Sequence, residues 1–280
     1  MTERAHYCQA CHGSTLRPMG GGPSEPSVAI CADCGTVYNR ASRDVSSDVV
    51  SVPAEAAIRE FSAYNLGAYQ NGSCDRILRA HVPPRGRALD IGCFDGAFVA
   101  FLKSRGFDAF GLEMQEDMVA FCRRQGLAVS AGMFPHALPE EMLRGRFDLI
   151  TSLESAYYWD DLESCAESLN TLLNADGHVM IKLVQGTSDY FSEVRRYDER
   201  TRDFRSLLNI RALRALLSRY GFDFVAATPH AYIHDRRRYH PNPILRCWYR
   251  NWNRLRSLWA AKMWPPEKWD KIVVLFRKRA

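Results

Sequence analysis

One stretch constrains the fold of this 280-residue chain more than any other: Arg87-Ala88-Leu89-Asp90-Ile91-Gly92-Cys93-Phe94-Asp95-Gly96-Ala97-Phe98. An apolar run ends at Asp90, a glycine turn follows, and a helical pattern begins at Phe98, which predicts a strand, a tight loop and a helix. Gly92 and Gly96 have no Cβ, so a ligand can come close to the backbone. The N-terminus of the helix adds free N–H groups and the positive end of a dipole. An open α/β sheet binds its nucleotide at a first strand–loop–helix of this kind.

Spacing and charge distinguish this loop from the common phosphate-binding loops. It reads Asp-x-Gly-x-x-x-Gly, and no Gly-Lys-Ser/Thr follows, which excludes a P-loop and the usual dinucleotide fingerprint. A carboxylate at Asp90 repels a pyrophosphate and attracts a cation or an amino group. A second acid, Glu113, stands 23 positions further on at the end of the run 108–113, where an acid suits a ribose diol.

The loop resembles motif I of the class I S-adenosylmethionine (SAM)-dependent methyltransferases, whose cofactor carries both a sulfonium and an α-amino group. Phe94 stands where the commonest form of this motif has its middle glycine. The resemblance covers roughly residues 60–228 and 271–277. It implies an α/β fold with a Rossmann-like, seven-stranded, mostly parallel sheet and helices on both faces, in which the seventh strand runs antiparallel between the fifth and the sixth. The alternative for the loop alone is a structural strand-to-helix turn.

The alternation of apolar runs and helical patterns places the elements of this sheet. The predicted strands are 87–91, 108–113, 126–129, 147–154, 179–184, 222–227 and 271–276. Helices are predicted over 116–125 and 209–219. The segment 41–85 contains a helix over 53–61 and a second one through Ile77 and Leu78, and in similar methyltransferases such a segment lies over the cofactor as a lid.

The resemblance also implies a set of cofactor contacts. Tyr64 and Tyr69, in the lid segment, are candidates for the methionine end of SAM, although both could equally pack the lid helices onto the core. Met133 and Phe134 stand where the family often has a Gly-Asp pair, so their backbone groups are expected to read the adenine and their side chains to wall the ring. The full candidate set is Tyr64, Tyr69, Asp90, Gly92, Phe94, Gly96, Glu113, Met114, Met133, Phe134, Leu153 and Glu154.

Candidates for acceptor contact or catalysis follow the fourth and sixth strands. They are Glu154, Tyr157, Tyr158 and His230, with His234 nearby, and each could instead be a surface or lid residue. Many small-molecule methyltransferases have Glu-His where this chain has Glu154-Ser155, so a histidine base is not carried over at that position. Methyl transfer is an in-line displacement at an activated carbon, so positioning supplies much of the rate. A general base helps only where the acceptor hydroxyl must lose its proton.

Four of the nine cysteines have the spacing of metal ligands: Cys8-x-x-Cys11 and Cys31-x-x-Cys34. Two such pairs close one tetrahedral zinc site with four thiolates, and a full shell of cysteines is structural. This pattern predicts a zinc ribbon over residues 1–40. The remaining cysteines are interpreted as small buried residues: Cys74, Cys93, Cys122, Cys165 and Cys247.

The C-terminal part of the chain is basic and amphipathic. From residue 229 to the end there are 13 Lys/Arg against three Asp/Glu, which leaves the rest of the chain net acidic although the whole has a charge of +5. Within 243–264, apolar residues recur at helical spacing on one face: Ile244, Leu245, Trp248, Trp252, Leu255, Trp259 and Met263. Such a helix is typical of an interfacial helix on anionic lipid. The alternatives are packing on its own domain or a homodimer, with the arginines solvated or binding an acidic acceptor.

These observations predict five regions: a zinc ribbon (1–40), a helical lid (41–85), a SAM-binding core (86–228), a basic aromatic helical insertion (229–270) and a last strand with a basic tail (271–280). No run of 18 apolar residues and no apolar leader are present, and nine cysteines favour a reducing compartment, so we expect a cytoplasmic protein, peripheral at the inner membrane face if the helix binds lipid.

The ribbon and core together resemble bacterial sugar and polysaccharide methyltransferases, as does the stretch Ser206-Leu207-Leu208-Asn209. The expected activity is therefore O-methylation of a sugar hydroxyl, free or within a glycan. A zinc-ribbon RNA methyltransferase is the first alternative, although no Asn/Asp-Pro-Pro-Tyr/Phe motif follows the fourth strand. A non-catalytic zinc-containing scaffold is the second.

Overall fold

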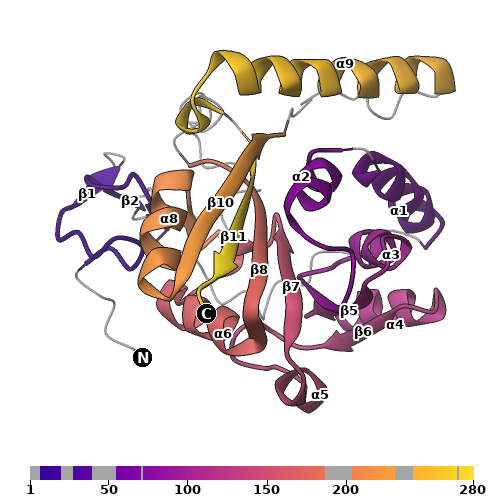
Figure 1. Cartoon of the computed structure of the whole chain (residues 1–280), viewed down its shortest axis with the longest axis horizontal. Coiled ribbons are helices and arrows are strands. Elements are labelled where there is room, and N and C mark those ends of the chain that lie inside the picture. Colours follow the sequence, from indigo (N-terminus) through magenta and orange to yellow (C-terminus); the bar gives the residue numbers. More distant parts are fainter. Residues whose placement is uncertain are drawn as a thin grey trace.

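The computed structural model describes residues 7–19, 28–39, 55–70, 72–186, 204–230, 242–269 and 271–280. Its centre is a sheet with the strand order β10-β11-β8-β7-β4-β5-β6 (Figure 1). The strands are β4 (Arg87–Ile91), β5 (Asp108–Glu113), β6 (Ala128–Ala131), β7 (Phe147–Leu153), β8 (Leu173–Val184), β10 (Phe222–Pro229) and β11 (Lys271–Lys278). β11 lies between β8 and β10, antiparallel to both, and the pairings from β8 to β6 are parallel. The predicted α/β fold with a reversed seventh strand is confirmed.

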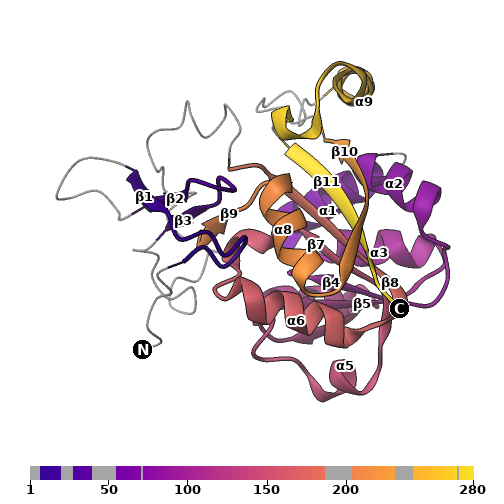
Figure 2. The ribbon, with the colours of Figure 1, turned by 60° about the vertical axis from the view of Figure 1, so that its left-hand side comes forward.

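Helices cover both faces of this sheet (Figure 2). One face is packed by α1 (Glu55–Tyr69), α2 (Ser73–His81), α3 (Ala97–Ser104) and α4 (Glu116–Arg124). The other face is packed by α5 (Glu140–Arg144), the short 3-10 helix η1 (Ala156–Tyr158), α6 (Leu162–Leu172) and α8 (Ile210–Arg219). α1 is longer than predicted, because its contacts with α3 outweigh the cost of about 1 kcal/mol that Gly67 brings to a helix interior.

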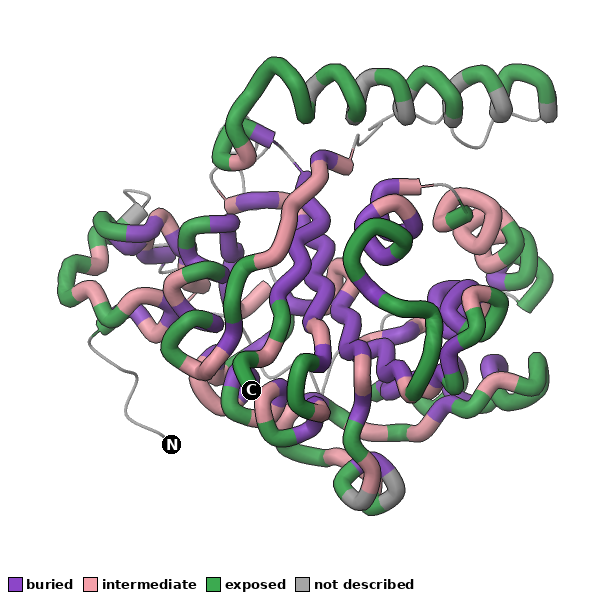
Figure 3. Tube along the Cα trace, in the orientation of Figure 1, coloured by how far each residue is buried: buried purple, intermediate pink, exposed green. Residues whose placement is uncertain are grey.

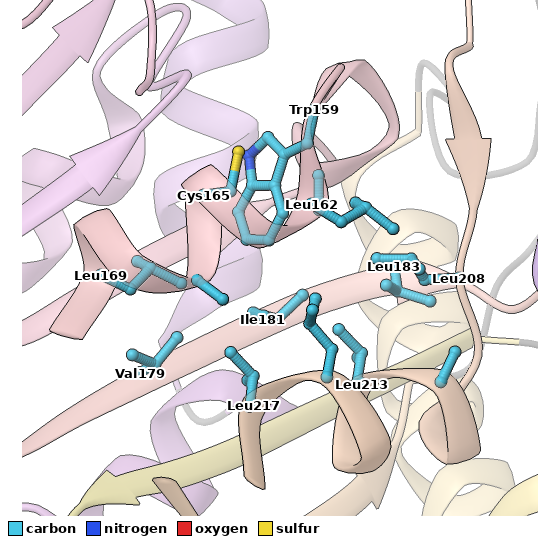
Figure 4. Close-up of a cluster of buried hydrophobic side chains, with 14 of the residues drawn as sticks. Trp159, Leu162, Cys165, Leu169, Val179, Ile181, Leu183, Leu208, Leu213 and Leu217 are labelled. Atoms are coloured by element: carbon cyan, nitrogen blue, oxygen red, sulfur yellow. The ribbon is translucent and has the colours of Figure 1, made fainter. Parts of the chain in front are cut away.

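The alternation of side chains along β8 divides the core into two clusters. Val179, Ile181 and Leu183 face α6 and α8, where they meet leucines of both helices (Figure 4). Met180 points to the opposite face, toward the cluster of α2, α3 and α4. Lys182 follows it with the same period of two, so a lysine at the end of this buried strand lies on the α1–α2 side of the sheet.

The cysteine-rich N-terminal segment forms a second small sheet with the order β1-β2-β3-β9. Its strands are β1 (Leu16–Met19), β2 (Val28–Cys31), β3 (Val37–Asn39) and β9 (Ser206–Leu207). β9 belongs to a part of the chain far from β1–β3 in the sequence. Val37 and Tyr38 of β3 pair with Leu207 and Ser206 of β9. The N-terminal segment therefore completes its sheet with a strand from the methyltransferase-like core.

Side chains at the two ends of α8 hold this segment in place. Arg219 donates to the carbonyls of Gln9 and Ala10, and the Asn209 amide donates to the carbonyl of Cys34 at 2.8 Å. Buried Cys8, Ala10, Val28, Cys31, Cys34 and Val37 belong to the same hydrophobic cluster as the α6 and α8 leucines. Residues 1–40 therefore have their own strands in the described part of the chain, but they share their core with the large sheet.

The predicted amphipathic helix is present as α9 (Pro243–Met263), followed by a 3-10 helix, η3 (Pro266–Lys268). α9 lies along the outside of the molecule, beyond the end of β10 and the start of β11 (Figure 1). Its described side chains are exposed along the length of the helix (Figure 3). Within the described ranges, no helix combines the length and apolar character that crossing a bilayer requires.

We predict that Asn209→Ala destabilises the protein by about 2–3 kcal/mol, because it removes two interactions at once. The Oδ1 atom caps α8 by accepting from Ala212 N at 3.0 Å, a bond worth about 1 kcal/mol. Loss of the Nδ2 atom leaves the carbonyl of Cys34 without its donor, at about 1–3 kcal/mol. Urea denaturation measures the change. Arg211→Ala, which removes an exposed bond to the carbonyl of Asp33, is the control and is expected to cost less than about 0.5 kcal/mol. Equal losses in both variants would contradict this account of docking.

Candidate functional site

The loop after β4 has a tightly bent backbone. Gly92, Phe94 and Gly96 have positive φ angles of 69°, 45° and 70°. A Cβ at Gly92 would lie 2.6 Å from the Cβ of Ser155, so this position requires glycine. Ser155 packs directly against the loop and donates to the carbonyl of Ile91 at 2.6 Å. The loop therefore brings bare backbone to the C-terminal edge of the sheet, as expected from the sequence.

Three carboxylates are buried around this loop: Asp90, Asp95 and Glu113. Asp90 accepts a hydrogen bond from Thr151 Oγ1 at 2.6 Å. Glu113 accepts from the backbone N–H groups of Phe94 at 2.8 Å and of Gln115 at 3.0 Å. Within the described ranges none of these three carboxylates forms an ion pair.

Burial shifts the pKa values of Asp90 and Asp95. Burial raises the pKa of Asp90 to about 7, the Thr151 hydroxyl opposes this, and the charges of Asp95 and Glu113 add to it. Burial also raises the pKa of Asp95, although Ala97 N–H and the Asn65 amide stabilise its carboxylate. A ligand with a sulfonium, an ammonium and a ribose diol matches this set of donors and charges. The residues present therefore fit SAM.

Helix α1 contacts the loop after β4. Asn65 donates to Asp95 Oδ2 at 3.1 Å, and the ring of Phe61 meets that of Phe94 edge-on at 6.3 Å. Tyr69 packs on Phe98, with 4.8 Å between ring centroids, which favours a packing role for this residue. Tyr64 is half-buried on the same helix.

Two methionines, Met114 and Met133, are candidates for the predicted contact with adenine. Met114, directly after β5, and Met133 have half-exposed side chains. The backbone N–H and carbonyl of Met133 both pair with Ala137, at 3.0 and 2.7 Å, so they are engaged within the turn. Phe134 is buried against Trp159. The methionine side chains, rather than these backbone groups, are therefore the ones available to a ring.

A second charged cluster lies at the end of β7 and includes Glu154, Lys182 and Lys271. Glu154, at φ 62° immediately after Leu153 and β7, receives two lysines on one oxygen. Lys182 Nζ is 3.0 Å and Lys271 Nζ is 2.5 Å from Glu154 Oε1. Both lysine side chains are buried, whereas that of Glu154 is 39% exposed. Burial alone would raise the pKa of Glu154, but the two lysines hold it well below its ordinary value.

His230 follows β10 beside this cluster. Its Nδ1 atom is 2.5 Å from Ser73 Oγ, and its backbone N–H donates to the carbonyl of Lys271 at 2.8 Å. Burial lowers the pKa of His230 well below its ordinary value, and the charges of Lys182 and Lys271 lower it further. The imidazole is therefore neutral at pH 7. His234 lies outside the described residues.

The two tyrosines after β7 have different surroundings. The hydroxyl of Tyr157 accepts from Val184 N–H, and its buried ring stacks on Phe204 with 4.6 Å between centroids. Tyr158 is 43% exposed and meets Phe204 edge-on. Tyr157 thus joins the loop after β7 to the end of β8, while the side chain of Tyr158 is partly exposed.

The four predicted metal ligands converge. The Sγ atoms of Cys8, Cys11, Cys31 and Cys34 all lie within 4.8 Å of one another. Cys8 and Cys34 are 3.6 Å apart, and Cys11 and Cys31 are 3.5 Å apart. Four sulfurs at about 2.3 Å from one ion would be separated by similar distances. Cys74, Cys93, Cys122 and Cys165 are buried elsewhere, as predicted, while the side chain of Cys247 lies outside the description.

Comparison with known proteins decides the family. Residues 67–227, more than half of the chain, match a family model described as a methyltransferase domain. This chain belongs to the methyltransferase domain family. The match begins within α1 and ends in β10, so it contains the acids, the glycine loop and Glu154 and leaves out the cysteine cluster and α9.

Solved structures share the fold of this methyltransferase. A SAM-dependent methyltransferase of Thermotoga maritima has a TM-score of 0.53 at 18% identity and covers 80% of this chain and 98% of its own. One from Mesorhizobium loti has a TM-score of 0.51 at 17% identity, with coverages of 75% and 99%. These structures show that the fold is shared, and their identities to this chain are too low to indicate a role or an acceptor.

Curated relatives match this chain over a shorter segment than the family model does. A ubiquinone biosynthesis O-methyltransferase of Methylococcus capsulatus is 28% identical over 109 residues, which is 37% of this chain and 46% of that protein. One from Pseudomonas aeruginosa is 28% identical over 102 residues, or 35% and 44%. The chain thus spans less than half the length of these relatives.

Several site residues were missed by sequence reasoning. Lys182 and Lys271 are lysines within apolar strands, and that isolation is a signal that could have marked them. Asp95 lies inside the glycine loop and could have been found from its position. Asn65 and Ser73 carried no comparable signal, because only the packing of α1 and α2 brings them to the site.

We predict that SAM affinity falls about tenfold as the pH is lowered from 8 to 6. The raised pKa of Asp90, about 7, means that its carboxylate becomes protonated in this range and no longer attracts the cationic cofactor. Calorimetric titration measures the affinity at each pH. Asp90→Asn should weaken binding and flatten the pH dependence. Glu113→Gln should weaken binding about tenfold to a hundredfold and retain the dependence. Asp108→Asn, an exposed acid at the opposite end of β5, is the control. A wild-type affinity that does not change with pH would contradict the role of Asp90.

Proposed function

We propose that this methyltransferase transfers the methyl group of SAM to a hydroxyl oxygen of a sugar, free or within a glycan. The observation that carries the proposal is a carboxylate held by two buried lysines beside a neutral histidine, at the edge where the cofactor residues lie. SAM supplies an activated methyl carbon. The residues of this chain must then bind the hydroxyl, orient it and accept its proton.

His230 is suited to accept that proton. When Nδ1 carries its hydrogen and donates to Ser73 Oγ, the Nε2 atom has a free lone pair. Nε2 forms no hydrogen bond with the described residues, and the lowered pKa of His230 keeps the ring unprotonated. Ser73 therefore acts as a positioning residue that fixes the ring and its tautomer.

Glu154 is suited to orient a polyhydroxyl acceptor. Both lysines contact Oε1, and we assign Oε2 to accept from a hydroxyl of the acceptor. The positive charge of Lys182 and Lys271 also favours an oxygen that is losing its proton. A sugar offers neighbouring hydroxyls, one for Glu154 and one for methylation.

One further point supports a sugar acceptor, and another supports transfer to oxygen. The stretch 206–209, which resembles sugar-modifying methyltransferases, is the part of the core that pairs with β3 and caps α8. The curated relatives are named as O-methyltransferases, which agrees with transfer to oxygen. A phenolic acceptor, as an alternative hydroxyl, and RNA are outcomes of the same test.

The test is methyl transfer from radiolabelled SAM to separate pools of nucleotide sugars and glycans, phenols, and RNA. Label is expected in the sugar pool and in a bond that resists mild alkali, as an ether does. Label only in the phenol pool, or label lost on ribonuclease treatment, would overturn the sugar assignment.

We predict that His230→Ala lowers kcat by about 10²–10⁴-fold on a hydroxyl acceptor while SAM affinity is retained, because the base is lost and the cofactor residues are intact. Steady-state kinetics and calorimetry measure the two quantities. His178→Ala is the matched control and should keep kcat, because His178 lies earlier on β8 than the end that carries Lys182. Unchanged kcat in His230→Ala would remove this residue from the mechanism.

We also propose one structural zinc ion per chain at Cys8, Cys11, Cys31 and Cys34, because their sulfurs are already assembled. Cys8→Ser combined with Cys11→Ser should abolish zinc and lower the midpoint of thermal unfolding, since these cysteines are part of the shared core. SAM binding should persist, because the acids lie on another part of the sheet. Elemental analysis reports the metal, and Cys165→Ala, a buried cysteine outside the cluster, should retain it. Wild-type protein purified without chelators and free of zinc would contradict the assignment.

A further inference from the structure

Helix α9 exposes an unusual amount of apolar surface for a water-facing helix. Its exposed large hydrophobic residues are Ile244, Leu245, Trp248, Trp252, Leu255, Leu258, Trp259 and Met263, with Trp264 immediately after. The rings of Trp248 and Trp252 stack with 5.9 Å between centroids, which joins them into one aromatic surface. The helix has 21 residues and so extends for about 30 Å. An exposed apolar surface of this extent indicates an interaction site.

The protein's own core does not cover this surface. α9 contacts β10, and its described side chains, tryptophans included, are exposed along the helix (Figure 3). The alternative in which the apolar residues pack on their own domain therefore does not hold for the described side chains. The occupant of this surface must come from outside the described chain.

The charge of α9 distinguishes between the possible binding partners of this surface. Residues 242–264 contain five Lys/Arg and no Asp/Glu: Arg246, Arg250, Arg254, Arg256 and Lys262. Two copies of α9 packed on each other would place two segments of net charge +5 side by side without an acid from either, which disfavours a homodimer through this surface. Tryptophan is the side chain that prefers the interface between hydrocarbon and water, and clustered arginine and lysine attract anionic lipid headgroups. Both properties are combined in this one helix.

We propose that α9 binds the surface of a membrane that contains anionic lipid, with its tryptophans and leucines inserted at the level of the headgroups. α9 contacts β10 and lies beyond the start of β11 (Figure 1). His230 follows β10, and Lys271 at the start of β11 contacts Glu154. Membrane binding therefore brings the acceptor side of the site close to the bilayer. An acceptor anchored in that bilayer would be within reach, a consequence that rests on the proposed function, whereas membrane binding itself does not.

The test is co-sedimentation of the full zinc-loaded chain with vesicles. One set contains about 30% phosphatidylglycerol in phosphatidylcholine and the other contains phosphatidylcholine alone. At about 50 mM salt most of the protein should pellet with the anionic vesicles, with at least about tenfold weaker binding to the neutral ones or at about 500 mM salt. A blue shift of tryptophan fluorescence should accompany binding, because insertion removes the indoles from water.

Two leucines provide a matched pair of variants. Leu255 on α9 and Leu143 on α5 are each 59% exposed, so replacing either with serine should leave the core intact. Leu255→Ser should weaken vesicle binding several-fold, Trp248→Ser combined with Trp252→Ser by at least about tenfold, and Leu143→Ser not at all. Unchanged SAM affinity confirms that each variant is folded.

Three results would overturn the proposal. Protein that stays in the supernatant with anionic vesicles at low salt excludes membrane binding. Equal effects of Leu255→Ser and Leu143→Ser would show that α9 is not the binding surface. A dimer detected by light scattering without lipid, and dissociated by Leu255→Ser, would assign α9 to a second copy of the chain.

Discussion

Buried negative charge at one edge of the sheet is the constraint on which this structure depends. Asp90, Asp95 and Glu113 lie within the reach of one loop, and in the described part of the chain no lysine or arginine pairs with them. Burying a carboxylate without a partner costs several kcal/mol, so this arrangement is stable only because backbone and hydroxyl donors hold each acid. The missing positive charge is what a sulfonium cofactor brings. The glycine loop and α1 then determine where that cofactor lies.

Positively charged side chains lie a short distance away on the same edge of the sheet. The antiparallel β11 places Lys271 on the same face as Lys182, and both lysines meet Glu154. One edge of the sheet therefore presents an acidic half that suits the cofactor and a basic half, with a neutral His230, that suits an oxygen losing its proton. The cysteine-rich segment and α9 attach to other parts of the core, and neither contributes a described residue to this pair of charged clusters.

The sequence predicted what depends on local patterns and missed what depends on packing. Asp90, Glu113 and the two cysteine pairs could be identified because their spacing along the chain determines their chemistry. The contact between β3 and β9 joins residues about 170 positions apart, and no local pattern indicates it. Tyr157 looked like an acceptor contact because it follows a strand end, but η1 turns its ring into the core. The lysine pair depends on the register of β11 against β8, which only the folded sheet specifies.

The central claim is that the acidic edge binds SAM, and titration calorimetry of the wild-type protein tests it most directly. The zinc-loaded chain at pH 8 should bind SAM with one site per chain. S-adenosylhomocysteine, which lacks the sulfonium charge, should bind to the same site and compete with SAM. A folded sample that gives no heat with either compound, and no increase in thermal stability, would contradict the account.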